Sequence, residues 1–409
     1  MWNGLLMSDS YQKKAKTFFR NDIRKDAENL RHASRNGDVE GVRRIISQKM
    51  VTVDSNWNYC STPCCEAALK GHKEVVKLLL ERGAELDKGD VFGATPLYEA
   101  ARNGHTNVVK LLLDGGADPK KGKSINVNSE LVFWHFTPLC EAALNGHKEL
   151  VQILLEGGAA PDKVDRWGET PLHWAAKEGH TNVVKLLIDG GADPNKGMKY
   201  NWTPLHIAAS HGYRAVVKHL LEGGADPNKP AENGRTPLHG ATWKGHEDVV
   251  QLLLDAGANP NKTDDYGRAP LDVALERGRK SVVKLLLEGG ADPNKPSDHG
   301  RTPLHRAARN GHTNVVKLLL DAGADPDKTD EDGRTLLHWA TKKGHEDVVQ
   351  LLLDAGADPD KADEDGRTPL DVALHRGRKR KGHTNVVKLL LKNGAIPNSE
   401  DTRLIQGLL

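Results

Sequence analysis

Histidine is the residue type in this sequence with the widest chemistry, since a neutral imidazole binds metal ions and transfers protons near neutral pH. The chain contains 19 histidines. Most of them fall at two repeated places. One is the end of a Thr-Pro-Leu-His motif or its Thr-Leu-Leu-His variant, at His173, His206, His239, His305 and His338. The other is the residue after a glycine, at His72, His105, His147, His180, His246, His312, His345 and His383. Copies at a fixed spacing lie one per structural layer, too far apart for the clustered ligands of a zinc site. The sequence therefore predicts no bound metal.

The four cysteines offer no better case for chemistry. Cys60, Cys64 and Cys65 crowd together without the paired spacing of a zinc knuckle or of a disulfide framework, which indicates a reducing compartment. No glycine-rich phosphate loop follows a predicted strand, and no Ser-His-Asp or Cys-His arrangement stands apart from the repeated motifs. We therefore expect a protein that is not an enzyme and holds no cofactor.

The histidines recur because the chain itself recurs. A Thr-Pro step marks each copy at Thr62, Thr95, Thr137, Thr170, Thr203, Thr236, Thr302 and Thr368, with imperfect copies at Ala269 and Thr335. Successive copies are 33 residues apart, except that Thr95 and Thr137 are 42 apart, so one copy carries a longer loop. A degenerate copy at 28–48 precedes them and gives about eleven units.

Each copy predicts two helices and a turn. In TPLHWAAKEGH (170–180), Thr170 suits an N-cap, Pro171 suits the first helical position, and the small alanines permit close helix packing. The next segment, TNVVKLLIDGG (181–191), carries an apolar stripe at helical spacing and ends in glycines that suit a left-handed cap. The turn that follows, ADPNKGMKYNW (192–202), is expected to project as a finger. A single copy cannot bury its stripe alone, so the copies must stack.

The shared pattern, TPLH.AA..GH..VVKLLL..GADPN, resembles the ankyrin repeat from about residue 28 to 397. The resemblance implies an all-α fold, an ankyrin-repeat solenoid of stacked antiparallel helix pairs with projecting β-turn fingers. It also implies that the fingers and first helices line a concave groove used for protein recognition. We expect an N-terminal helical cap at 1–27, the repeat array at 28–397 with insertions at about 121–134 and 378–382, and a C-terminal tail or partial cap at 398–409.

Composition limits the partners and the location. Lys and Arg total 58 against 56 Asp and Glu, and the formal charge of +2 gives no overall field towards nucleic acid or membrane. The apolar runs are far shorter than the roughly 20 residues of a membrane helix, and the N-terminal segment turns polar too early for a signal peptide. We expect a cytoplasmic protein, with the nucleus as the alternative because RGRKRKG (376–382) resembles a nuclear import signal.

Aromatic residues vary between copies and gather on one predicted face. The fingers carry Trp57, Tyr59, Phe92, Trp134, Phe136, Trp167, Tyr200, Trp202 and Tyr266, and the first helices carry Trp174, Trp243 and Trp339. None of these twelve lies in the Val/Leu stripe of a second helix. Aromatic residues outside the core resemble the anchors that dominate protein interfaces, so we predict that they contact a partner. The alternative is that the fingers pack on one another.

Charge varies along the same face. Four residues after the Thr, where a first helix should face the groove, stand Glu66, Glu99, Glu141 and, in a later copy, Arg306. One residue before the Thr position stand Arg235, Arg268, Arg301, Arg334 and Arg367, which we expect to pair with nearby Asp, as in ankyrin-like fingers. We predict a groove that is acidic and aromatic in its N-terminal half and basic in its C-terminal half, and that orients an extended partner. Solvated surface charge is the alternative.

The sequence thus predicts a scaffold or adaptor that binds another protein or an extended peptide in its groove and is monomeric. The alternative is a substrate-recruiting subunit of a ubiquitin ligase or a host-directed effector, although the sequence contains no docking segment of the kind that role needs. Nucleic acid is a weaker candidate because acidic fingers alternate with the basic residues. We expect no small-molecule substrate and no insertion into a membrane.

Overall fold

The computed structural model describes residues 9–48, 51–55, 61–90, 92–123, 136–377, 381–398, 401–402 and 405. The described chain is helical, with two isolated β-bridges and no extended strand in those ranges. It divides into two compact units, which are an N-terminal unit of residues 1–199 and 222–224 and a C-terminal unit of residues 200–221 and 225–409. The all-α fold class is confirmed.

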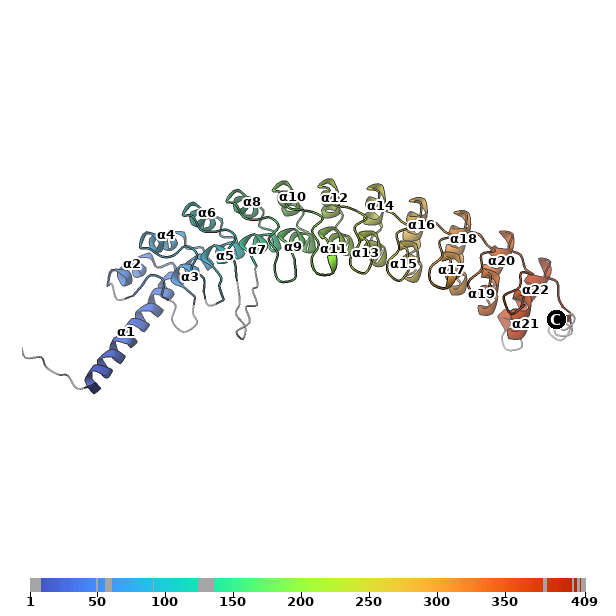
Figure 1. The fold of residues 1–409 in the computed structure, drawn as a ribbon, viewed down its shortest axis with the longest axis horizontal. Coiled ribbons are helices and arrows are strands. Elements are labelled where there is room, and N and C mark those ends of the chain that lie inside the picture. The colour runs from blue at the N-terminus through green and yellow to red at the C-terminus, as the bar shows by residue number, and fades with distance from the viewer. Residues whose placement is uncertain are drawn as a thin grey trace, which may run out of the picture. The chain divides into compact units, whose positions relative to one another are not determined.

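In the N-terminal unit, first helices pack on first helices and second helices on second helices, which gives two rows of helices (Figure 1). The rows begin with α1 (Asp9–Asn36) and α2 (Val39–Ser47). The first helices are then α3 (Pro63–Leu69), α5 (Pro96–Arg102), α7 (Pro138–Leu144) and α9 (Pro171–Glu178), and the second helices are α4 (Lys73–Glu81), α6 (Thr106–Asp114), α8 (Lys148–Glu156) and α10 (Thr181–Asp189). Because α1 packs on α3 and runs unbroken past residue 27, the expected cap and the first repeat share one helix.

The C-terminal unit repeats the arrangement. Its first helices are α11 (Pro204–His211), α13 (Pro237–Lys244), α15 (Pro270–Glu276), α17 (Pro303–Asn310), α19 (Leu336–Lys343) and α21 (Pro369–Gly377). Its second helices are α12 (Arg214–Glu222), α14 (Glu247–Asp255), α16 (Lys280–Glu288), α18 (Thr313–Asp321), α20 (Glu346–Asp354) and α22 (Lys381–Lys392). Two short 3-10 turns, η1 (Lys199–Asn201) and η2 (Asp298–Gly300), lie in the fingers. The basic insertion is only partly described, since residues 378–380 lie outside the described ranges.

The Thr-His motif closes the start of a first helix. The backbone N–H of His173 donates to Thr170 Oγ1 at 3.4 Å, and His173 Nδ1 accepts from the backbone N–H of Thr170 at 3.1 Å. This capping box satisfies donors that a helix N-terminus leaves free. The helix ends at Gly179, which has φ 77°, a left-handed conformation that favours glycine. The predicted N-cap Thr170 is therefore confirmed, and the left-handed glycine predicted at the end of the second helix is Gly191, with φ 87°.

The Gly-His motif joins neighbouring repeats. His180 Nε2 lies 2.9 Å from the backbone oxygen of Leu144 in the preceding repeat. A Cβ atom on Gly146 would lie 2.8 Å from the His180 ring, so the close approach needs glycine there. Below this contact Val183, Val184 and Leu187 are fully or almost fully buried. These histidines are structural, as the repeated spacing predicted.

The described cysteines are packed in the core. Cys64, Cys65 and Cys140 are buried free thiols, and burial raises the pKa of Cys64 and Cys140 to about 12. A thiol with such a pKa holds its proton at neutral pH and is a poor nucleophile. Cys60 lies outside the described residues. Within the described part of the chain, no helix is long and apolar enough to cross a membrane.

Acid should unfold the C-terminal unit through its capping histidines. Burial lowers the pKa of His206 from 6.5 to about 4 and also lowers the pKa values of His239, His305 and His338.

A lowered histidine pKa means that the folded state favours the neutral ring. The resulting stability is complete above pH 6.5 and is lost as pH falls towards 4, by about 3 kcal/mol for His206. Urea melts of wild type and His206→Gln between pH 7.5 and 4.5 should show a smaller loss in the variant. Equal losses in both proteins would contradict the assignment.

Candidate functional site

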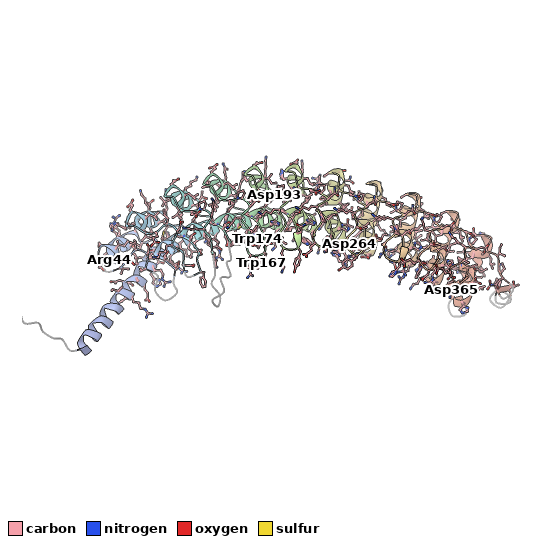
Figure 2. The ribbon with its side chains drawn as sticks, viewed as in Figure 1. Arg44, Trp167, Trp174, Asp193, Asp264 and Asp365 are labelled. Carbon is pink, nitrogen blue, oxygen red and sulfur yellow. The ribbon has the colours of Figure 1, made fainter. Side chains whose placement is uncertain are left out.

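The finger aromatics of the N-terminal unit extend into solvent. Phe92 is 50% exposed and Trp167 is 36% exposed. In each finger an aspartate side chain holds the turn, because the backbone N–H of Phe92 donates to Asp90 Oδ1 and that of Trp167 donates to Asp165 Oδ1, both at 2.8 Å. Each ring is therefore presented by a turn whose backbone is fixed; Trp167 is labelled in Figure 2.

The C-terminal unit presents two exposed tyrosines, Tyr266 on an aspartate-held turn and Tyr200 in η1 with a φ of 63°. Tyr200 is 59% exposed and Tyr266 is 62% exposed, and the backbone N–H of Tyr266 donates to Asp264 Oδ1 at 3.0 Å. Among the described residues, four of the five large exposed hydrophobic side chains are these finger aromatics, and the fifth is Ile396. Each of the four aromatics occupies the position three residues before the Thr or Ala that starts a first helix. The aromatic positions that vary between repeats are therefore the ones left accessible.

Cations lie over several of these rings. Lys123 Nζ lies 5.6 Å from the centre of the Phe92 ring, and the Arg166 guanidinium lies 3.7 Å from that of Trp167. Such contacts hold the ring in place without covering both of its faces. Three other predicted aromatics, Trp57, Tyr59 and Trp134, lie outside the described residues, as does most of the insertion.

The aromatics nearer the first helices are half buried. Phe136 meets Trp174 edge to face, with ring centres 5.4 Å apart, and Trp202 tilts against His206 at 5.7 Å. Trp174 Nε1 is buried and has no hydrogen-bond partner among the described residues. Trp243 lies under the Arg277 guanidinium at 3.1 Å. Contacts within the protein therefore cover part of each of these rings.

Three residues predicted to face a partner are instead buried inside the array. Glu66, Glu141 and Trp339 are 4%, 7% and 8% exposed. Trp339 Nε1 donates to Asp330 Oδ2 at 2.9 Å. The prediction that these side chains are open to a partner is therefore wrong for Glu66 and Glu141, whereas Trp339 keeps only the part of its surface that lines a cavity.

The two buried glutamates have different partners. Glu66 on α3 forms ion pairs with Arg31 and Arg35 of α1, at 3.7 and 3.4 Å. Glu141 accepts a hydrogen bond from the Tyr98 hydroxyl, and burial together with the Glu141 charge raises the pKa of Tyr98. Glu99 remains partly exposed, and burial raises its pKa above the ordinary value. Of the three predicted acidic residues, only Glu99 is accessible on this face.

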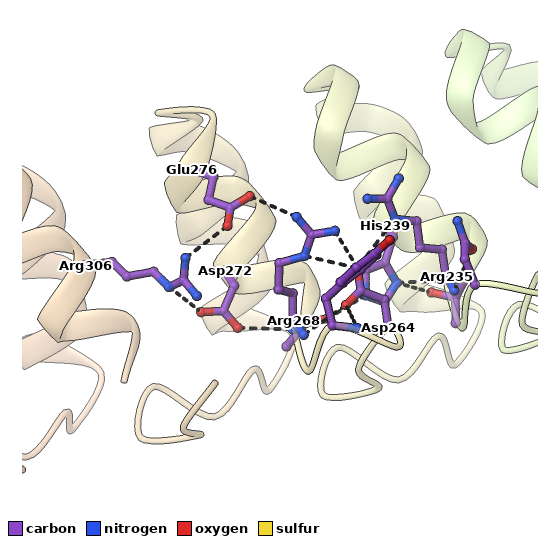
Figure 3. A network of polar contacts seen from close by, with 11 residues as sticks. Arg235, His239, Asp264, Arg268, Asp272, Glu276 and Arg306 are labelled. Carbon is purple, nitrogen blue, oxygen red and sulfur yellow. Dashed lines mark hydrogen bonds and ion pairs between the residues drawn. The ribbon is translucent and has the colours of Figure 1, made fainter. Parts of the chain in front are cut away.

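Arginines of the C-terminal unit link neighbouring repeats (Figure 3). Arg235 and Arg268 both contact Asp264, at 3.5 and 2.8 Å, and Arg268 also reaches Glu276 at 3.4 Å. Burial alone would raise the pKa of Asp264, but the hydrogen bonds and charge of Arg268 outweigh it and lower that pKa. The predicted pairing of finger arginines with aspartates is confirmed here, and also for Arg334 and Arg367.

Arg306 continues this network instead of standing free. Its guanidinium lies 3.3 Å from Asp272 and 3.0 Å from Glu276. Asp272 takes the place of the capping histidine and accepts from the backbone N–H of Ala269 at 3.1 Å. Burial raises the pKa of Asp272 to about 6, against the opposing charge of Arg306. Arg306 therefore compensates a buried carboxylate.

The family can now be assigned. A model of ankyrin repeats (3 copies) matches residues 30–123, 120–198, 139–231, 196–264, 256–330 and 322–401, so the chain belongs to the ankyrin repeat family. It is also 44% identical over 64 residues to ankyrin repeat-containing protein YIL001W of Saccharomyces cerevisiae. That match covers 16% of this chain and 12% of the yeast protein, so it reflects the shared repeat.

One arginine does not follow the predicted pairing. Arg301 forms no ion pair with any described carboxylate, unlike the four arginines at the equivalent positions. The sequence held a signal for this, because Ser297 replaces the aspartate found four residues before Arg268, Arg334 and Arg367.

Removing Arg306 should expose the cost of the buried Asp272 carboxylate. We expect Arg306→Gln to lower the free energy of unfolding by roughly 3 kcal/mol at pH 7.5, since a buried charge loses its partner. In an Asp272→Asn background the same change should cost below about 1 kcal/mol.

Lower pH provides the internal control. Asp272 binds a proton as pH falls through about 6, so the effect of Arg306→Gln should shrink in urea melts below that pH. An effect of Arg306→Gln that is independent of both pH and residue 272 would show that the pair does not matter.

Proposed function

We propose that this chain is a non-catalytic scaffold that binds an extended peptide or a partner domain on its finger face, by which we mean the fingers and first helices of each unit. Ankyrin repeats generally mediate protein-protein interaction. Fold alone does not define a partner, so the proposal rests on the residues that differ between repeats.

The accessible finger aromatics carry the proposal. Phe92 and Trp167 in the N-terminal unit, and Tyr200 and Tyr266 in the C-terminal unit, stay exposed although a buried aromatic ring would stabilise the fold. Aromatic side chains lose little conformational entropy on binding and are enriched among the residues that dominate interface energies. Aspartates hold the turns of Phe92, Trp167 and Tyr266, so these three rings are largely preorganised for contact.

Trp174 supports a peptide-like partner. Its buried Nε1–H finds no acceptor among the described residues, and an unsatisfied buried donor is costly. A backbone carbonyl oxygen of a bound segment would reach it only after a shift of the ring, because this atom is closed to solvent in the free protein.

A substrate-recruiting subunit would use the same finger face. The difference between an adaptor and a recruiter lies in what else the partner binds, and a captured partner would therefore decide between the two.

Removing the exposed rings should abolish partner binding without unfolding the protein. We expect immobilised wild type to retain a specific protein from an extract of the source cells, and Phe92→Ala/Trp167→Ala/Tyr266→Ala to lose it. The affinity for the purified partner should fall by at least about a hundredfold, since one interface anchor contributes about 2 kcal/mol or more.

Ile396→Ala provides the matched control, because Ile396 is exposed but lies outside the aromatic finger positions. Thermal melts should confirm that both variants remain folded. Retention of the same partner by the triple variant would contradict the proposal, as would equal loss in the control.

A further inference from the structure

A positively charged cavity lies in the C-terminal unit. It has a volume of about 220 Å³ and is lined by His299, Arg301, His305, Arg306, Arg309 and Trp339. These residues come from one finger, from α17 and from α19 of the next repeat. A space of this size admits a polar side chain but not a folded element.

Two of the three arginines in the cavity have no carboxylate partner in the part of the chain that the structure describes. Arg301 and Arg309 form no ion pair with any described carboxylate, whereas Arg306 is held by Asp272 and Glu276. The buried Arg301 Nε also has no hydrogen-bond partner among the described residues. An unsatisfied, partly buried guanidinium is costly, and a bound anion would relieve that cost.

The neighbouring sequence explains why Arg301 is unpaired. The aspartate that pairs with Arg268 or Arg367 from four residues earlier is Ser297 here, and the Ser297 hydroxyl instead donates to the backbone oxygen of Arg301 at 3.1 Å. The next finger offers Asp330, in the place where Asp264 serves Arg235. Asp330 Oδ2, however, already accepts from Trp339 Nε1 at 2.9 Å.

Further positive charge surrounds the tryptophan wall. Arg301, Arg309, Lys342 and Arg334 lie 5.2, 5.3, 5.3 and 5.9 Å from the Trp339 ring centre. Like charges around one ring repel one another, and the low polarity of the ring does not screen them. The negative face of the indole stabilises the cations only in part.

The other titratable groups do not cancel this charge. Burial lowers the pKa of His305, so its ring is a neutral wall at pH 7. His299 lines the cavity and lies 3.4 Å from the exposed Glu331. Asp332 is bound to Arg334 at 2.6 Å. Asp330 also keeps a negative charge beside the Trp339 Nε1–H, but the residues that line the cavity include three arginines and no described carboxylate, so the lining itself is positively charged.

We propose that this cavity, named here the Trp339 pocket, binds the side-chain carboxylate of an Asp or Glu residue in an acidic peptide segment. The inference deepens the proposed function, on which it rests, by naming the chemistry of the segment that the C-terminal unit recognises. A guanidinium fork matches a carboxylate in two parallel hydrogen bonds, and the Trp339 wall packs against the methylene groups of the same side chain.

A carboxylate fits the surroundings better than a phosphoryl group does. Asp272 and Glu276 lie within 3.3 Å of Arg306 at one side of the pocket, and each would repel a dianion twice as strongly as a monoanion. The two unpaired arginines can instead engage two successive acidic side chains of one segment.

The test uses rhodamine-labelled hexaglutamate, with hexaglutamine as the neutral probe, and fluorescence anisotropy at low salt. We expect wild type to bind hexaglutamate and not hexaglutamine. Arg301→Gln/Arg309→Gln should weaken binding by about tenfold or more, since a lost charge-assisted hydrogen bond costs that factor.

A charge-matched control is available at the same repeat positions. Arg102 stands seven residues after Thr95, as Arg309 does after Thr302, and Arg367 directly precedes Thr368, as Arg301 precedes Thr302. Arg102→Gln/Arg367→Gln removes the same charge away from the pocket and should change the affinity by less than about twofold. Thermal melts show whether each variant is folded.

Three results would overturn the proposal. Wild type could fail to bind hexaglutamate, the two double variants could weaken it equally, or a peptide of three phosphoserines could bind over tenfold more tightly than hexaglutamate. The proposed function fails separately, because Phe92→Ala/Trp167→Ala/Tyr266→Ala should still bind hexaglutamate while losing the partner.

Discussion

The structure depends on contacts that each repeat can make only with its neighbour. The His180 ring lies against Gly146 and its Nε2 reaches the Leu144 carbonyl, while the apolar residues beneath it are buried. A side chain on that glycine would collide with the ring, and a shift of one repeat along its axis would break the hydrogen bond. The register between repeats is therefore fixed, and changes in sequence are tolerated mainly in the fingers and on the exposed face of the first helices.

Because the register is fixed, the residue three positions after the start of a first helix can be histidine or aspartate. Both side chains make the same hydrogen bond to the backbone, but their charges differ. His206 and Asp272 hold the same place in their repeats, and both accept from the backbone N–H that begins the helix. The histidine is neutral because burial lowers its pKa, whereas the aspartate is an acid whose pKa burial raises to about 6. The backbone geometry is the same in both cases, but the acid requires Arg306 from the following repeat. At this position the same backbone geometry therefore supports either a neutral histidine or an acid that needs a cation from the next repeat.

The sequence was sufficient to predict the parts of the fold that depend on local chemistry. The first helices start at a Thr-Pro step because Thr170 and Pro171 satisfy the requirements of a helix start without help from elsewhere. It was not sufficient for the exposure of Glu66, Glu141 or Trp339, because their partners lie in another repeat or finger. Glu141 is covered because it accepts a hydrogen bond from the hydroxyl of Tyr98, which lies 43 residues earlier in the sequence. The exposure of Phe92 and Tyr266 was predictable because their turns are set locally, and the cations that approach the rings leave them largely uncovered.

Two tryptophans at the same repeat position have different surroundings on the same backbone. Trp174 and Trp339 each stand four residues after the Thr that starts a first helix. The residue that meets the ring from the preceding finger is Phe136 in the first case, at 5.4 Å, and Arg301 in the second, at 5.2 Å. Around Trp174 the indole N–H is unsatisfied, whereas around Trp339 it is bound to Asp330 and the nearby guanidinium is unpaired. The backbone is the same at both positions, so the difference comes from the side chain that precedes the Thr of the preceding repeat, which is Phe136 in one case and Arg301 in the other. This difference in surroundings is what our two proposals for partner chemistry depend on.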